Sequence, residues 1–176
     1  MNLHFSIVVP VYNRPQEVLE LLESLRAQCY EQPYEIVIVE DGSTETSEEV
    51  VKAFTDLNIA YYFKENSGPG ASRNYGMQRA KGNYYLILDS DCVLPEDYLS
   101  SVENALTARY TDFFGGPDAA HEDFTTLQKA INYAMTSFLT TGGIRGRKRA
   151  TTYFEPRSFN MGISKEAFEA SKGFGN

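Results

Sequence analysis

Two aspartates separated by one serine, in the stretch YLILDSDCVLPED, are the residues of this sequence best suited to chemistry. Asp89 and Asp91 directly follow an apolar run at residues 85–88, which is typical of a buried strand. Two carboxylates this close repel each other unless a cation lies near both. Mg²⁺ and Mn²⁺ prefer hard oxygen ligands and are usually held by one or two carboxylates plus phosphate oxygens. The pair therefore predicts a site for Mn²⁺ or Mg²⁺.

The same acids could instead cap the helix that follows, because the N-terminus of a helix near Pro95 favours negative charge. Glu96 and Asp97 already supply that charge, which weakens this alternative. The D-x-D pattern alone has low specificity, so the interpretation depends on the polar residues elsewhere in the chain.

Three further residues have types that suit nucleotide binding. Asp41 ends another apolar run and could accept a hydrogen bond from a base or ribose, although D-G-S is also common turn chemistry. Arg73 follows a glycine-rich segment and could meet a base carbonyl or a phosphate; the alternative is an ordinary surface arginine. Tyr12 could stack on a base, and its alternative is core packing.

The elements that must position these residues alternate between strands and helices. Apolar runs predict strands at residues 5–12, 34–43, 59–66, 83–91, 111–116 and near 158–163. Amphipathic patterns predict helices at residues 13–28, 46–54, 69–82, 95–110 and 124–139, and a short one beginning near Ser164. Such alternation predicts an α/β fold, with a mostly parallel twisted sheet and helices on both faces. Ligands of such sheets bind beyond the carboxyl ends of the strands, where the polar residues above are expected.

Three local signals predict where helices begin or end. Asn13 can cap the first helix, with a proline two residues later in its first turn. Thr46 and Glu49 have the spacing of a capping box, and Gly82 is placed to stop the third helix.

Composition limits the function classes. The chain has 176 residues, enough for one domain, and a formal net charge of −8. That charge argues against a nucleic-acid partner, and it means that an anionic ligand would need local cations or a metal. No apolar run reaches membrane-spanning length. The basic segment Arg145–Arg149 is interpreted as a solvated loop, with a flap over an anionic substrate as the alternative.

Four stretches together resemble family 2 glycosyltransferases in their order and spacing. They are SIVVPVYNR, EIVIVEDGST, NSGPGASRNYGMQRAKGNYYLILDSD and NMGISKEAFEASKGF. The most specific part, Asn66–Asp91, resembles the family's N-x-G-x-x-x-A-R-N-x-G followed by D-x-D. The resemblance implies a GT-A fold and a nucleotide-sugar donor. It also implies a single domain over residues 1–176, with a nucleotide-binding half at 1–91 and the start of an acceptor-side half at 92–176.

The resemblance also implies the site residues. A nucleotide-sugar site is expected from Pro10, Val11, Tyr12, Asn13, Asp41, Asn66, Gly68, Arg73, Asp89 and Ser90. Asp91, together with Asp89, is implied as the ligand of Mn²⁺ or Mg²⁺ that bridges the diphosphate. Tyr12 is expected to stack on the base and Asp41 to hydrogen-bond to it.

The chain departs from the family pattern at three places. Cys92 stands where a third acid is frequent, and Ser72 where alanine is usual before the arginine. The family's catalytic base is an Asp of an E-D pair shortly after a G-G-F turn. The stretch KGFG resembles that turn, so the general base is expected beyond Asn176.

The expected function is inverting transfer of a sugar, with a UDP-sugar as the preferred donor, to a glycan or lipid-linked acceptor. Cell-surface polysaccharide synthesis is the expected context, in the cytoplasm or at the inner face of the membrane. One alternative is a phosphotransferase of the haloacid-dehalogenase type, with Asp89 as nucleophile, because LILDSDCV fits that motif. The other is a nucleotide-sugar-binding domain without turnover.

Overall fold

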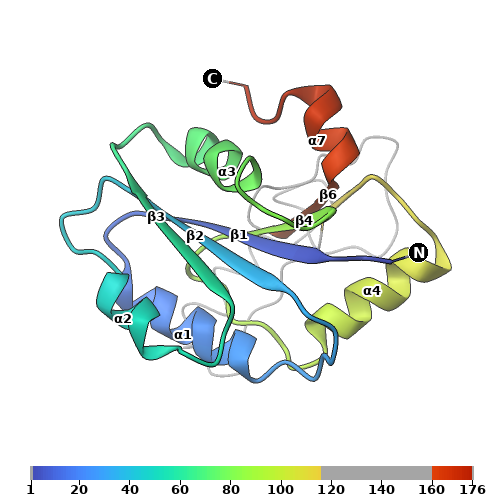
Figure 1. The fold of residues 1–176 in the computed structure, drawn as a ribbon, viewed down its shortest axis with the longest axis horizontal. Coiled ribbons are helices and arrows are strands. Elements are labelled where there is room, and N and C mark those ends of the chain that lie inside the picture. The colour runs from blue at the N-terminus through green and yellow to red at the C-terminus, as the bar shows by residue number, and fades with distance from the viewer. Residues whose placement is uncertain (1, 116–159, 176) are drawn as a thin grey trace, which may run out of the picture. The chain divides into compact units, whose positions relative to one another are not determined.

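The computed structural model describes residues 2–115 and 160–175, and Figure 1 shows its elements. The strands are β1 (Phe5–Val11), β2 (Glu35–Asp41), β3 (Ile59–Lys64), β4 (Tyr84–Leu88), β5 (Phe113–Gly115) and β6 (Asn160–Ser164). The helices are α1 (Pro15–Arg26), α2 (Glu48–Ala53), α3 (Pro69–Met77), α4 (Tyr98–Ala108) and α7 (Lys165–Ser171). The predicted strands and these helices are confirmed. The helix predicted at residues 124–139 and the basic segment at residues 145–149 lie outside the described residues.

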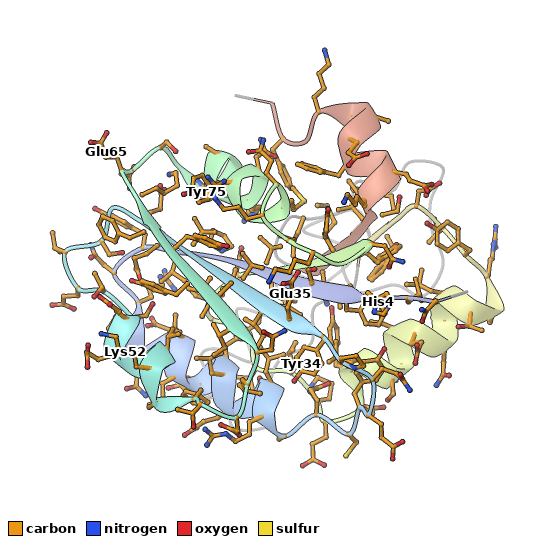
Figure 2. All side chains as sticks on the ribbon, viewed as in Figure 1. His4, Tyr34, Glu35, Lys52, Glu65 and Tyr75 are labelled. Atoms are coloured by element: carbon orange, nitrogen blue, oxygen red, sulfur yellow. The ribbon has the colours of Figure 1, made fainter. Side chains whose placement is uncertain are left out.

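The strands form one sheet in the order β3-β2-β1-β4-β6-β5. The pairs β1–β2, β2–β3 and β1–β4 are parallel, whereas β6 runs antiparallel to β4. This confirms the predicted α/β class with a mostly parallel sheet. In Figure 2, Glu65 lies just beyond the carboxyl end of β3, and Glu35 lies at the amino end of β2. The residues that follow β1, β2, β3 and β4 therefore meet at one edge of the sheet.

The helices cover both faces of the sheet: α1, α2 and α4 lie on one side and α3 and α7 on the other (Figure 1). Alternate residues of each strand serve the two layers, as the period of a strand requires. On β1, Ile7 and Val9 pack in the cluster formed with α1, α2 and α4. Val8, between them, belongs to the second cluster, which contains Met77 of α3 and Phe168 of α7. Because both faces are covered, β2 and β4 are buried along their whole length and β1 at all but one residue, and each has an apolar run at its centre, as the sequence predicted.

The helix α3 lies very close to the sheet. A Cβ atom added at Gly76 would lie 2.6 Å from Val8 Cγ1 and 3.1 Å from Val39 Cγ2. Glycine is therefore required at this position by packing, and it lets the last turn of α3 lie close to β1 and β2.

The predicted cap of α2 is wrong. Its N-cap is Ser47, not Thr46, and Ser47 makes no side-chain cap hydrogen bond. The Ser47 hydroxyl instead donates to the buried carboxylate of Glu40, at 2.6 Å. A contact with the end of β2, seven residues earlier, thus replaces the cap within the first turn that the spacing suggested.

The predicted stop at Gly82 is also wrong, because α3 ends five residues earlier, at Met77. Gly82 lies against the start of β1, where an added Cβ would fall 2.3 Å from the His4 carbonyl oxygen. Its N–H donates to Ser6 Oγ at 2.8 Å. The glycine is explained by close approach of two backbone segments.

Residues 1–114 and 158–176 group into one compact unit, which contains nearly all of the described residues. The halves predicted at residues 1–91 and 92–176 stay predictions. Within the ranges that the structure describes, no helix has both the length and the apolar character needed to cross a membrane.

Candidate functional site

An open cleft of about 480 Å³ lies where β1, β2, β3 and β4 end. Its lining consists of Pro10, Val11, Tyr12, Arg14, Asp41, Asn66, Gly68, Pro69, Arg73, Asp89, Ser90 and Asp91. The sheet thus gathers residues that are up to about 80 positions apart in the sequence, because parallel strands present their carboxyl ends at a common edge.

The cleft contains every residue that the sequence predicted for the site except Asn13. Their roles in ligand binding stay predictions. Two lining residues were missed, Arg14 and Pro69. Each directly follows a predicted site residue in the chain, and this position is the signal that could have identified it.

Asn13 joins two loops instead of lining the cleft. It has a left-handed backbone, with φ of 53°, which asparagine tolerates better than most residues. Its N–H donates to Ser43 Oγ at 2.7 Å, and its Oδ1 accepts from the N–H groups of Thr44 at 2.8 Å and Glu45 at 3.0 Å. The predicted cap of α1 is therefore wrong: the N-cap is Arg14, without a side-chain cap bond. Asn13 therefore connects the loop after β1 to the loop after β2. Its neighbours in sequence, Tyr12 and Arg14, line the cleft.

Glu40 anchors the other side of this connection. Its side chain is fully buried at the end of β2 and accepts hydrogen bonds from Ser43 Oγ, from the Ser47 N–H at 2.9 Å and from the Tyr61 hydroxyl at 3.0 Å. Burial first, and then the charge of Glu40, raise the pKa of the Tyr61 hydroxyl, which keeps it a donor. Sequence reasoning missed this role, although two of the partners, Ser43 and Ser47, are only three and seven residues away in the chain.

Asp41 is held from several directions at the floor of the cleft. Its Oδ1 accepts from Lys64 Nζ and from the Ser67 N–H at 2.9 Å, and its Oδ2 accepts from the Gly68 N–H at 2.9 Å. Burial alone would raise the pKa of Asp41, but the hydrogen bonds from Lys64, Ser67 and Ser72, with the charge of Lys64, outweigh it and lower the pKa. Asp41 therefore stays ionised, and it orders the loop between β3 and α3.

Arg73 brings a nearly buried cation to the cleft. The residue is 8% exposed, and its Nη2 donates to Asp89 Oδ1 at 2.7 Å. Its carbon Cζ also lies 5.5 Å from the ring centroid of Phe174, within the range of a cation–π contact. Its Nε is buried and has no hydrogen-bond partner in the described part of the chain. Two restraints thus fix the guanidinium group while part of its donor capacity remains unused.

Asp91 is much more open than Asp89. Its side chain is 60% exposed, and it pairs with Arg14, whose Nη1 lies 3.5 Å from Oδ2 and whose side chain is itself half exposed. Such an exposed pair contributes little stability, so the Asp91 carboxylate can exchange this partner for another cation at low cost.

The donor set fits a divalent ion that takes several ligands from a substrate. No group of three or more His, Cys, Asp or Glu side chains that could hold a metal occurs within residues 2–115 and 160–175. Two carboxylates, Asp89 and Asp91, line one cleft, and one oxygen of Asp89 already accepts from Arg73. Mg²⁺ and Mn²⁺ are typically held in this way, by one or two carboxylates together with phosphate oxygens.

Comparisons with known proteins were made on sequence and on structure. The family model for glycosyl transferase family 2 matches residues 6–171. Glycosyltransferase GlyA of Streptococcus pneumoniae is 35% identical over 113 residues, which are 63% of this chain and 16% of that protein. The poly(ribitol-phosphate) beta-N-acetylglucosaminyltransferase TarS of Staphylococcus aureus is 29% identical over 114 residues, 62% of this chain and 20% of that protein. The chain thus spans a small part of the length of these relatives.

Solved structures share the fold. TarS in complex with UDP-GlcNAc superposes with a TM-score of 0.73 at 22% identity, covering 96% of this chain and 47% of that one. The mannosyltransferase PcManGT of Pyrobaculum calidifontis, in complex with GDP-Man and Mn²⁺, gives a TM-score of 0.75 at 20% identity, covering 99% and 48%. The expected GT-A architecture is thereby confirmed.

Proposed function

Because this chain belongs to glycosyl transferase family 2, we propose that its cleft binds a nucleoside-diphosphate sugar and that the protein transfers the sugar to an acceptor. The observation that carries the proposal is the convergence of Tyr12, Asp41, Arg73 and Asp91 on one cleft from the ends of different strands and from α3. An aromatic ring, a fixed carboxylate, a buried cation and an open carboxylate together suit a base, a diphosphate and a divalent ion.

The base is assigned to the part of the cleft next to β1 and β2. The side chain of Tyr12 is free to stack, since the residue is 53% exposed. Asp41 Oδ2 accepts from Gly68 and can accept one further hydrogen bond, from an N–H of the base. Uridine is the preferred choice. The neighbours TarS and PcManGT are solved with UDP-GlcNAc and GDP-Man, so guanosine is included in the test.

The diphosphate is assigned to Arg73 and to the N-terminus of α3. Gly68 and Pro69 line the cleft at the start of α3, where the helix dipole favours an anion. Asp89 holds Arg73, so its charge is oriented before the donor arrives, and among the residues that the structure describes its Nε has no hydrogen-bond partner. In an acidic protein, this arginine and the helix N-terminus lower the cost of bringing a diphosphate into the cleft.

A divalent ion, Mn²⁺ or Mg²⁺, is assigned to Asp91 with support from Asp89. When bound, it would stabilise the charge that develops on the leaving diphosphate. The exposed Asp91 carboxylate would provide the protein ligand, and Arg73 would hold the Asp89 carboxylate in a fixed orientation. Inversion at the sugar carbon by a single displacement, and a general base located after Asn176, remain predictions from the family resemblance.

The acceptor and the location are proposed more broadly. A glycan or lipid-linked acceptor and a role in cell-surface polysaccharide synthesis agree with the name of the relative TarS, which acts on poly(ribitol-phosphate). A cytoplasmic location is the expected one. Family membership favours sugar transfer over the phosphotransferase alternative. A domain that binds the donor without transferring the sugar is distinguished by assaying transfer as well as binding.

A binding screen tests the proposal. The melting temperature of the protein would be measured with UDP, GDP, UDP-GlcNAc and GDP-Man, each with and without Mn²⁺. We expect at least one nucleotide to raise it, more with the metal than without. Asp91→Asn should remove the metal-dependent part of this rise, whereas Glu96→Gln, an exposed acid of the same loop outside the cleft lining, should not. The site assignment would be refuted if every nucleotide changed the melting temperature equally, with and without the metal, in both wild type and Asp91→Asn.

A further inference from the structure

The side chain of Asn74 on α3 is paired with the backbone of Phe174, one hundred residues later in the chain. Asn74 Nδ2 donates to the Phe174 carbonyl oxygen at 2.9 Å, and the Phe174 N–H donates to Asn74 Oδ1 at 2.9 Å. Asparagine offers one donor and one acceptor side by side, so it satisfies both backbone groups of a single residue, as a neighbouring strand would. Aspartate at this position could not donate to the carbonyl.

The turn that carries Phe174 is shaped around this contact. Lys172 and Gly173 both have left-handed backbones, with φ of 62° and 77°. A Cβ atom at Gly173 would lie 2.2 Å from Asn74 Oδ1 and 2.7 Å from Phe168 Cε2. Only glycine therefore combines the required φ with the required space, and the segment from Lys172 to Phe174 fits α3 closely.

The same turn reaches the cleft through one further contact. The ring of Phe174 faces the guanidinium group of Arg73, with Cζ 5.5 Å from the ring centroid. On its other side Arg73 bonds to Asp89, and both Arg73 and Asp89 line the cleft. A continuous path of direct contacts thus leads from Asn74 to Phe174, then to Arg73 and to Asp89.

We propose that Asn74 is a positioning residue for the donor cleft: by fixing Phe174 it holds the guanidinium group of Arg73 in place, so that the cleft and the turn Lys172–Phe174 become ordered together. The identity of the donor rests on the proposed function, but the coupling does not. Asn74, which holds the turn, is thus the direct neighbour in sequence of Arg73, which lines the cleft.

A purely structural clamp would behave differently. If Asn74 served only to attach α7, a change in the cleft would not alter the order of the turn, and loss of Asn74 would not alter the affinity for a nucleotide. The exchange rate of the Phe174 amide hydrogen, measured by NMR, separates the two cases, because exchange of a hydrogen-bonded amide follows local opening.

The first arm of the experiment needs no ligand. Asn74→Ala should raise the exchange rate of the Phe174 amide about tenfold or more, since its acceptor is removed. In the contacts of the described residues, Asp89 is joined to the turn through Arg73. Asp89→Ala should therefore raise the same exchange rate, about threefold. Asn58→Ala is the matched control, because Asn58 makes its side-chain bond to the Tyr34 carbonyl at the other end of the sheet. It should leave the rate unchanged. An unchanged rate in Asp89→Ala would overturn the proposal.

The second arm adds UDP or GDP with Mn²⁺ to wild type, to Asn74→Ala and Gly173→Ala, and to the control Asn58→Ala. Bound nucleotide should slow exchange at Phe174 in wild type, and both variants should bind it about three- to tenfold more weakly than Asn58→Ala does. Asn74→Ala disturbs the contact from α3, and Gly173→Ala disturbs it from the turn. If both variants bind the nucleotide more weakly, the effect cannot come from a folding defect of one variant alone. A nucleotide that binds without changing exchange at Phe174 would overturn the coupling and leave the proposed function intact. If no nucleotide binds while Asp89→Ala still accelerates exchange, the proposed function fails and the coupling stands.

Discussion

Arg73 Nη2 lies 2.7 Å from Asp89 Oδ1, and this ion pair joins α3 to the end of β4 inside the cleft. The pair links the two most specific motifs of the sequence, the segment G-A-S-R-N and the D-x-D pattern. The arginine is almost buried while the aspartate is partly open, with side-chain exposures of 9% and 37%. Asp89 thus has an oxygen available for a ligand, while the Phe174 ring restrains Arg73.

Replacing Arg73 by lysine should weaken donor binding about tenfold or more. Lysine keeps the charge but loses the planar group that contacts both Asp89 and the Phe174 ring. Isothermal titration with the best nucleotide of the screen measures the change. Arg79→Lys is the control, since Arg79 lies 3.3 Å from the ring centroid of Tyr75 and does not line the cleft. Equal affinities for both variants would contradict the assignment of Arg73.

Replacing Glu40 by glutamine should destabilise the fold by about 2 kcal/mol, because the new amide group would face the donors of Ser43, Ser47 and Tyr61. Urea unfolding at pH 7 gives the free energy of unfolding. Glu49→Gln, at a side chain that is 87% exposed, should change it by less than about 0.5 kcal/mol. If both variants unfold alike, the buried carboxylate is not the anchor described.

The contribution of Asp41 to stability should depend on pH. Its folded-state pKa lies below the ordinary value of 3.8, so the ionised form stabilises the fold above that value, and this contribution is lost as pH falls through the folded-state pKa. Asp41→Asn should therefore be less stable than wild type by about 1–3 kcal/mol at pH 7, with a smaller difference near pH 3. Urea unfolding of both proteins at the two pH values tests this. A difference that stays constant or grows towards acid would show that Asp41 does not gain its ionised partners on folding.

Gly76→Ala should destabilise the protein by about 1–3 kcal/mol through overpacking of α3 on the sheet. Gly70→Ala is the control in the same helix, because a Cβ there would lie 3.6 Å from Phe174 Cβ, an ordinary contact. That change should be neutral or stabilising, since alanine is the better helix former. Thermal unfolding distinguishes them, and a stabilised Gly76→Ala variant would mean that α3 can move away from Val8 without cost.

The strands and the edge that binds ligands were predictable because their signals are local. Uninterrupted apolar runs such as IVIV in β2 indicate strands buried on both faces, and the alternation with helices makes them parallel. Once the strands are parallel, Asp41 and Asp89 must lie at the same edge. The positions of nearly all predicted site residues in one cleft follow from this single step.

The contacts that fix these residues were not predictable, because they depend on strand register and on distant segments. Lys64 meets Asp41 because the two are register partners in β2 and β3, which no spacing in the sequence reveals. The caps failed for a related reason. Asn13, the predicted cap of α1, accepts from the loop after β2, and Ser47, which takes the position predicted for Thr46, donates to Glu40 in β2. Local propensity gives way where a buried polar group needs a donor.

The antiparallel position of β6 next to β4 has a kinetic consequence. In the register of this pair, Leu88 meets Asn160, so closing it requires a loop of about 70 residues, and the contact between Asn74 and Phe174 spans one hundred. During synthesis the strands β1 to β4 emerge first and can pair, whereas the ring that restrains Arg73 emerges much later. A nascent chain therefore carries the residues of its cleft before the last restraint on its arginine exists, and we expect the cleft to become fully ordered only after Phe174 has emerged.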